Sequence, residues 1–274
     1  MSSIRDTLQA AGLAPSKARG QNFLRSSATA RRLVAAAGVT AADAVVEVGP
    51  GLGQLTRPLA AVARRVVAIE VDRGLVRWLA SQELPATVEV LHQDVMQADL
   101  GGLARTLGPP VMLVGNLPYS LSGRLLGALL GPRNPFRGMA LMLQSEVAER
   151  VLAEPGSPAY GPLAVWSRLW MPARRALSLG RGEFEPEPQV RSTFLLFAPR
   201  RPAPQVDPGL LRRLVRTAFQ QRRKGLRGAL RREFPAADRA LRRAGIEGLR
   251  RAETLSEEEF VRLAGAIADP EARG

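Results

Sequence analysis

Short apolar runs alternate with longer segments of helical periodicity along most of the chain. The apolar runs lack the polar–apolar alternation of a half-exposed strand, and they occupy residues 45–48, 66–69, 88–91, 111–114 and 139–143. Segments with helical spacing precede and separate them, at residues 28–37, 54–63, 73–81, 121–130 and 146–153. This order predicts an α/β fold with a mainly parallel sheet that is covered by helices on both faces. A last apolar run, 193–197, is expected to close one edge of the sheet.

The composition changes near residue 200. The proline-rich stretch 199–204 predicts a stiff linker. Beyond it only helical patterns follow, at residues 210–221, 226–234, 236–244 and 257–268. We therefore predict an α/β domain over residues 1–200, which begins with a loop-rich lead-in at 1–25, and a smaller all-helical domain over residues 201–274.

The charge of the chain points to a polyanionic partner. The formal net charge is +14, and residues 201–274 hold half of it, with seventeen basic and ten acidic side chains. A compositional bias toward arginine is the alternative explanation, because Lys17 and Lys224 are the only lysines. Such a bias accounts for the choice of arginine over lysine but not for the excess of basic residues. We therefore expect nucleic acid, and RNA in particular, as the partner.

Several classes of protein are disfavoured by what the chain contains. It has no cysteine and a single histidine, His92, so a thiolate nucleophile and a metal site built on cysteine or several histidines are excluded. No apolar run is long enough to span a membrane, and the N-terminus lacks the apolar stretch of a signal peptide. We expect a cytoplasmic protein without a metal, and nothing in the sequence demands more than a monomer.

A glycine-rich turn, residues 47–53, follows the first predicted strand. Glycines allow the backbone to turn tightly and to approach a ligand closely at this edge of the sheet. The dinucleotide pattern requires a third glycine on the helix, at the position of Gln54 or of Thr56 according to the register. Neither residue is a glycine, so the dinucleotide pattern is absent.

Carboxylates stand at three successive strand ends, where Glu47, Glu70, Asp72 and Asp94 are found. Each of them alone could be a helix cap or a solvated loop residue. Together they disfavour a pyrophosphate and suit a ligand with hydroxyls, an amine and a positive centre. S-adenosylmethionine has all three, with Glu70 expected at the ribose, Asp94 near the adenine amine and the glycine loop beside the methionine part. NAD would also favour an acid at Glu70, so that residue does not discriminate.

The tetrapeptide Asn116-Leu117-Pro118-Tyr119 follows the fourth predicted strand. The Asn116 oxygen and the carbonyl of Leu117 or Pro118 can each accept one N–H of a planar amine, and Tyr119 can stack on its ring. Held in this way, the amine directs its lone pair at an activated methyl group, so orientation provides much of the catalysis. Phe184, in a proline-rich loop, is a candidate for covering the other face of the base. The alternatives are an Asn-Pro turn that ends a strand and ordinary loop packing of Phe184.

These motifs together resemble those of the ribosomal RNA adenine dimethyltransferases, specifically the bacterial small-subunit type. The resemblance extends over most of the chain and rests on several motifs in the family's order, at residues 17–24, 47–53, 116–119, 184–192, 219–224 and 251–256. It implies a Rossmann-like class I methyltransferase sheet and a metal-free enzyme that uses S-adenosylmethionine. Methyl groups would be transferred in pairs to each of two adjacent adenines, in a hairpin near the 3′ end of the small-subunit (16S) rRNA.

The resemblance also implies roles for individual residues. Expected at the methyl donor are Gln21, Asn22, Leu24, Gly49, Gly51, Gly53, Glu70, Asp94 and Asn116. Phosphate contacts are expected at Arg222, Arg223, Lys224, Arg227 and Arg231, for which a solvated arginine-rich face is the alternative. Competing functions are a resistance-type large-subunit rRNA methyltransferase and a ribosome assembly factor without catalysis. A DNA adenine or protein-glutamine methyltransferase is a more distant alternative.

Overall fold

The computed structural model describes residues 3–16, 19–221 and 223–269, without the side chains of Tyr119 and Ser120. Predictions that concern Lys17, Ala18, Arg222 and the Tyr119 side chain therefore lie outside the described residues. Two compact units are formed, the first from residues 1–129, 133–148 and 173–199 and the second from residues 130–132, 149–172 and 200–274.

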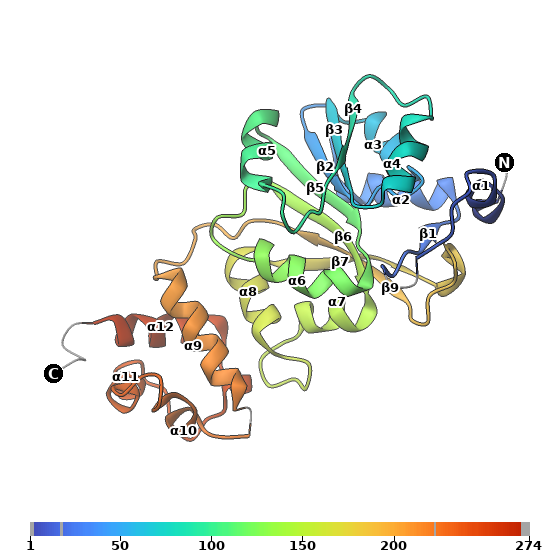
Figure 1. Cartoon of the computed structure of the whole chain (residues 1–274). Coiled ribbons are helices and arrows are strands. Elements are labelled where there is room, and N and C mark those ends of the chain that lie inside the picture. The colour runs from blue at the N-terminus through green and yellow to red at the C-terminus, as the bar shows by residue number, and fades with distance from the viewer. Residues whose placement is uncertain (1–2, 17–18, 222, 270–274) are drawn as a thin grey trace. The chain divides into compact units, whose positions relative to one another are not determined.

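A seven-stranded sheet forms the centre of the first unit, in the order β4-β3-β2-β5-β6-β9-β7 (Figure 1). Five strands are parallel to one another: β2 (Ala44–Val48), β3 (Arg65–Glu70), β4 (Val88–His92), β5 (Val111–Asn116) and β6 (Gly138–Gln144). The other two are antiparallel to their neighbours: β7 (Ala173–Leu179) and β9 (Ser192–Phe197). The expectation that residues 193–197 close the edge of the sheet is wrong, because β9 lies between β6 and β7. The prediction of a mainly parallel, Rossmann-like sheet is therefore confirmed.

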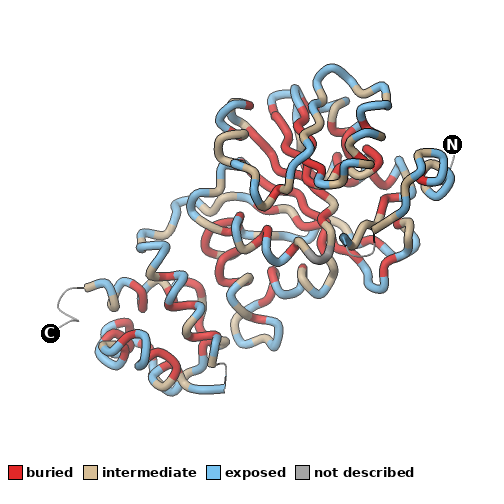
Figure 2. Tube along the Cα trace, viewed as in Figure 1, coloured by how far each residue is buried: buried red, intermediate tan, exposed pale blue. Residues whose placement is uncertain are grey.

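Burial explains why the strands read as continuous apolar runs. Every residue of β2 is buried, as are all but the last residues of β5 and β6, and Figure 2 shows these strands as the buried centre of the unit. One face of the sheet packs Val45, Met112 and Val114 against Leu33 of α2 and Leu59 of α3. Because both faces are covered, side chains along these strands are almost all apolar, and the one carboxylate among them, Glu47 of β2, is buried.

Helices of the first unit follow the predicted segments with shifted ends and two additions. The structure has α1 (Ile4–Ala10), α2 (Ser27–Ala37), α3 (Thr56–Ala60), α4 (Arg73–Ala80), α5 (Leu100–Leu107), α6 (Tyr119–Leu129) and α7 (Ser145–Leu152), the last of which reaches into residues of the second unit. α1 lies in the segment expected to be loop, where the Ser3 and Asp6 side chains cap its first turn. α3 begins two residues later than predicted, because the glycine loop continues through Leu55.

A two-stranded ribbon joins the start of the first unit to a distant loop. β1 (Phe23–Leu24) pairs antiparallel with β8 (Phe184–Glu185), which follows a short 3-10 turn, η1 (Arg181–Glu183). Phe23 lies opposite Glu185, and Leu24 lies opposite Phe184. The ribbon is too short to leave a period in the sequence, so neither strand was predicted.

The second unit contains helices and a single 3-10 turn among its described residues. These are α8 (Pro162–Trp170), α9 (Pro208–Gln220), α10 (Leu226–Leu230), α11 (Ala237–Arg243), η2 (Ala252–Thr254) and α12 (Glu257–Ala268). Asp207 caps α9, and a capping box of Ser256 and Glu259 begins α12. The predicted division at residue 200 coincides with one boundary of this unit, but residues 149–172 also belong to it. Tyr160, for example, packs against Phe219 on α9, with 6.0 Å between the two ring centroids.

None of the helices in the described ranges combines the length and the hydropathy needed to span a bilayer.

Candidate active site

A cavity opens where the strand order reverses. β3 and β4 lie on one side of β2, whereas β5 lies on its other side, and ligands of open parallel sheets bind at the carboxyl ends of the strands beside such a point. The cavity has a volume of about 890 Å³ with the solvent at its mouth, and its walls include Glu47, Glu70, Asp94 and Asn116 from four successive parallel strands. These residues are far apart in the sequence, and the parallel sheet brings them to one edge.

The glycine loop forms one wall through Gly49 and Gly51, both of which have backbone angles in the left-handed region. A Cβ atom at Gly51 would lie 3.0 Å from the ring of Phe23, so only glycine fits beneath that ring without displacing it. The Gly51 N–H donates to Glu70 Oε2 at 3.3 Å. Gly53 is not among the residues that line the cavity, because it lies behind the loop, where a Cβ atom would meet Leu79 at 3.2 Å. The expected ligand contact of Gly53 stays a prediction.

Glu47 is the most unusual ionisable group of the cavity. Its side chain is 1% exposed, and neither carboxyl oxygen has a hydrogen-bond partner among the described residues. Burial raises the pKa of Glu47 to about 8; the nearby Thr56 hydroxyl opposes this rise, and the Glu70 charge adds a little to it. At neutral pH this side chain is therefore largely protonated and can donate a hydrogen bond.

Glu70 differs from Glu47 because both of its oxygens have backbone partners. Oε1 accepts from the Asp72 N–H at 2.9 Å, and Oε2 accepts from Gly51. Burial still raises the pKa of Glu70 above its ordinary value. Asp94, two residues after the end of β4, is half-buried and accepts from the Met96 N–H at 2.9 Å. The predicted acidic edge of the sheet is thus present along three strand ends of the cavity.

Residues of the N-terminal lead-in form the opposite wall. Gln21, Asn22 and Leu24, which the sequence places at the donor, all line the cavity, together with Arg19. The Asn22 carbonyl accepts a hydrogen bond of 2.9 Å from Nδ2 of Asn116. Sequence reasoning placed these residues at the cavity only through the family motif, since a short extended segment has no periodic signal.

The Asn116 turn joins the end of β5 to the start of α6, and Asn116, Leu117 and Pro118 all line the cavity. The Leu117 N–H donates to the Met142 carbonyl at 3.3 Å, which ties the turn to β6. The Pro118 carbonyl accepts from Leu121 N at 2.9 Å and from Ser122 Oγ at 3.2 Å, so it is engaged by the first turn of α6.

Gly115, in β5 just before this turn, is a further residue that sequence reasoning missed. A Cβ atom there would lie 2.8 Å from the Val48 carbonyl and 3.2 Å from Leu117. The approach of β2 and β5 at the switch point therefore requires glycine. The signal that could have found it is the glycine itself, which interrupts an otherwise apolar strand immediately before the polar turn.

Phe184, the candidate for covering the other face of the base, lies in the hydrophobic core. It is 1% exposed and belongs to the core cluster that includes Leu24, Leu33 and Phe194. Its pairing with Leu24 in the β1–β8 ribbon directs the ring into this core, and it does not line the cavity. The expectation that Phe184 covers a base stays a prediction, and it requires the ring to leave the core that it occupies in this structure.

The predicted phosphate contacts lie in the second unit. Arg223, Lys224 and Arg231 are exposed in the turns beside the short helix α10. Arg227 is also exposed, but its Nε donates to Asp238 Oδ1 at 2.8 Å, so part of its charge is already paired. The predicted helix 226–234 is shorter in the structure and ends at Leu230.

Comparison with known proteins identifies the family. Residues 15–269 match the model of the ribosomal RNA adenine dimethylase family. A protein of Magnetococcus marinus is 42% identical over 264 residues, which cover 95% of each chain, and one of Chelativorans is 44% identical over 270 residues, 96% of this chain and 97% of that protein. Both relatives are called ribosomal RNA small subunit methyltransferase A.

Solved structures agree with this assignment at the level of the fold. A dimethyladenosine transferase of Plasmodium falciparum superposes with a TM-score of 0.74 at 22% identity, over 88% of this chain and 95% of that one. The 23S rRNA methyltransferase ErmE superposes with a TM-score of 0.64 at 25% identity, over 90% of this chain and all of that one. With the cavity at the switch point and the match over nearly its whole length, the chain belongs to the ribosomal RNA adenine dimethylase family.

Proposed function

We propose that this enzyme uses S-adenosylmethionine to dimethylate the exocyclic amines of two adjacent adenines, in a hairpin near the 3′ end of the small-subunit (16S) rRNA. The observation that carries the proposal is the position of Asn116, which ends β5 beside a cavity with an acidic edge. The names of the relatives at 42% and 44% identity support the small subunit as the source of the RNA. We further propose that it acts as a monomer in the cytoplasm, where ribosomal subunits assemble.

The residues of the cavity fit S-adenosylmethionine. Glu70 is suited to the ribose hydroxyls and Asp94 to the adenine amine, while Gly49 and Gly51 allow close approach of the methionine part. Gln21, Asn22 and Leu24 would cover the bound molecule from the other side. The unpartnered Glu47 supplies a buried polar group beneath the loop. A pyrophosphate would meet an edge of carboxylates, so a dinucleotide fits less well.

When bound, S-adenosylmethionine supplies a methyl group that its sulfonium already activates for transfer. The remaining task of the protein is to present the amine, whose lone pair is delocalised into the base. Asn116 Nδ2 is held by the Asn22 carbonyl, which leaves Oδ1 to accept one amine N–H. The second acceptor is the Leu117 carbonyl, because that of Pro118 is engaged by Leu121 and Ser122. Two acceptors in fixed positions favour a pyramidal amine whose lone pair points at the methyl.

The RNA would be held by stacking and by phosphate contacts. Tyr119, which begins α6, is proposed to stack on the flipped base. Arg222, Arg223, Lys224, Arg227 and Arg231 are proposed to bind phosphates, and Arg227 would contribute least because Asp238 already pairs with it. Such contacts position an RNA without reading its sequence.

Incubation with separated ribosomal subunits tests the proposal. Small subunits that lack the modification and, in parallel, large subunits are incubated with the enzyme and S-adenosylmethionine, and the rRNA nucleosides are quantified by mass spectrometry. We expect dimethyladenosine in the small subunit alone, at two neighbouring positions near its 3′ end. Dimethyladenosine in the large subunit alone would support the resistance-type function instead. Binding to small subunits without any methylated product would support a purely structural assembly factor.

A further inference from the structure

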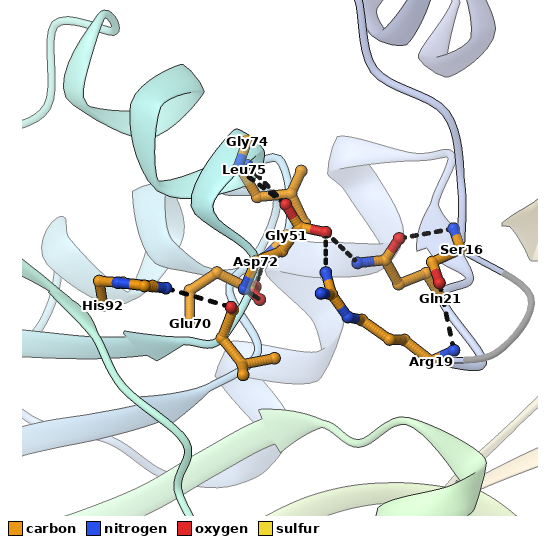
Figure 3. A network of polar contacts seen from close by, with 10 residues as sticks. Ser16, Arg19, Gln21, Gly51, Glu70, Asp72, Gly74, Leu75 and His92 are labelled. Atoms are coloured by element: carbon orange, nitrogen blue, oxygen red, sulfur yellow. Dashed lines mark hydrogen bonds and ion pairs between the residues drawn. The ribbon is translucent and has the colours of Figure 1, made fainter.

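Asp72 links the N-terminal wall of the cavity to the body of the sheet. Its two carboxylate oxygens have different partners, as Figure 3 shows. Oδ1 caps α4, where it accepts from the N–H groups of Gly74 at 2.8 Å and Leu75 at 3.3 Å. Oδ2 faces the lead-in, where it pairs with Arg19 and accepts from Gln21 Nε2 at 3.4 Å. One side chain therefore serves as both a helix cap and an anchor for the lead-in.

The anchored residues continue directly to Asn22. Gln21 is held on its other side by Ser16, whose N–H donates to Gln21 Oε1 at 2.8 Å (Figure 3). Asn22 Nδ2 donates to the Gly20 carbonyl at 3.0 Å, which closes a local turn. Immediately after it, Phe23 enters the β1–β8 ribbon and covers Gly51. The Asn22 carbonyl is thus held between two fixed points, Asp72 before it and the ribbon after it.

The position of this carbonyl decides which way the Asn116 amide faces. An asparagine amide can occupy its site in two orientations, which exchange an acceptor for a donor. With Nδ2 bound to the Asn22 carbonyl at 2.9 Å, Oδ1 is the atom left for the substrate. The opposite orientation would present an N–H to the amine, and it would place two carbonyl oxygens against each other at Asn22.

We propose that Asp72 is a positioning residue for methyl transfer. Through Arg19 and Gln21 it holds the segment whose Asn22 carbonyl orients the Asn116 amide. The inference rests on the proposed role of Asn116. Asp72 itself does not line the cavity, so it acts through the residues that it anchors.

The test uses substitutions that separate the anchor from the helix cap. Asp72→Asn keeps an oxygen for the cap of α4, where asparagine is as effective as aspartate, but it replaces the oxygen that pairs with Arg19. Arg19→Ala removes the anchor from the other side, and Arg19→Lys restores a cation. Asp99→Asn is the matched control, because Asp99 caps α5 through Gly102 and lies 3.8 Å from Arg105, but it is not in the cavity wall.

The methyl-transfer rate is measured in a single turnover on small subunits, with saturating S-adenosylmethionine and enzyme. We expect Asp72→Asn and Arg19→Ala to lower this rate by about 10-fold, the order expected when a reacting group is misplaced by less than an ångström. The affinity for small subunits and the melting temperature should stay close to those of the parent protein. Arg19→Lys should recover most of the rate, and Asp99→Asn should not change it. In protein labelled with ¹⁵N-asparagine, the Asn116 side-chain amide signal should shift in Arg19→Ala.

Two results would overturn the inference. One is a normal rate at saturation with only a raised KM for S-adenosylmethionine, which would show that the lead-in helps to bind S-adenosylmethionine but does not position Asn116. The other is an unshifted Asn116 amide signal. Asn116→Ala, measured in parallel, distinguishes a failure of the proposed role of Asn116 from a failure of the role of Asp72. An active Asn116→Ala would refute the proposed role of Asn116, whereas an inactive one beside a fully active Asp72→Asn would refute the role of Asp72 alone.

Discussion

Glu47→Gln should remove a pH dependence of stability from the protein without its cofactor. The substitution keeps the size and shape of the side chain but removes its ionisation. In the folded protein Glu47 is 1% exposed, its oxygens have no hydrogen-bond partner among the described residues, and burial raises its pKa to about 8. In the unfolded chain the same carboxyl titrates near 4.5.

The sign and size of the pH dependence follow from the difference between the pKa values of Glu47 in the folded and unfolded states. Between pH 4.5 and 8 the folded state keeps a proton that the unfolded state has lost. The free energy of unfolding therefore falls with rising pH, by up to about 1.4 kcal/mol per pH unit from this group. Over the whole interval the loss amounts to about 4 to 5 kcal/mol. The stabilisation is complete below pH 4.5 and is lost by about pH 8.

Urea unfolding at a series of pH values from 5 to 9 measures this loss. Because Glu70 and other groups titrate as well, the quantity of interest is the difference between the parent protein and Glu47→Gln. That difference should change by several kcal/mol in favour of the variant as the pH rises, while Glu83→Gln, at an exposed loop position, should show no such trend. A difference that stays constant with pH would refute the assignment of a buried, unpartnered carboxyl at Glu47.

Two further substitutions test the packing of the first unit. Asp43→Ala should lower the free energy of unfolding by about 1 to 3 kcal/mol in urea unfolding, because Asp43 is fully buried and the Thr40 N–H would lose its acceptor, whereas the partly exposed Arg137 keeps the Gly38 carbonyl and water as partners; an unchanged free energy of unfolding would contradict this role. Phe184→Leu should lower the melting temperature but keep most of the methyl-transfer rate, because the ring packs in the core; a large loss of rate in a stable variant would show that the ring reaches the base during the reaction.

Much of the fold could be predicted because its strands are buried on both faces. β5 and β6 have continuous apolar runs, β2 is apolar apart from Glu47, and the carboxyl ends of such parallel strands meet at one edge. Glu70, Asp94 and Asn116 could therefore be assigned to one site from their place after a strand. β7 was missed for the opposite reason: it lies at the edge of the sheet beside β9, and Arg174 and Arg175 within it are exposed.

The details of the site depended on contacts that leave no pattern in the sequence. Arg19 pairs with Asp72 across 53 positions, and Asn116 bonds to Asn22 across 94. The place of Phe184 in the core could not be predicted either, since it follows from a two-residue ribbon with Leu24. An aromatic residue in a proline-rich loop has the same sequence signature whether it covers a ligand or fills a core.

Comparison of Asn116→Ala with the parent protein tests the central claim most directly. Dimethyladenosine on small subunits is quantified by mass spectrometry after a fixed time, and the Kd for small subunits is measured on the same preparations. The account predicts that Asn116→Ala forms no detectable dimethyladenosine and binds small subunits with nearly the parent affinity. Dimethyladenosine at the parent level, or an equal loss of binding and product, would contradict the assignment of Asn116 as the residue that presents the amine.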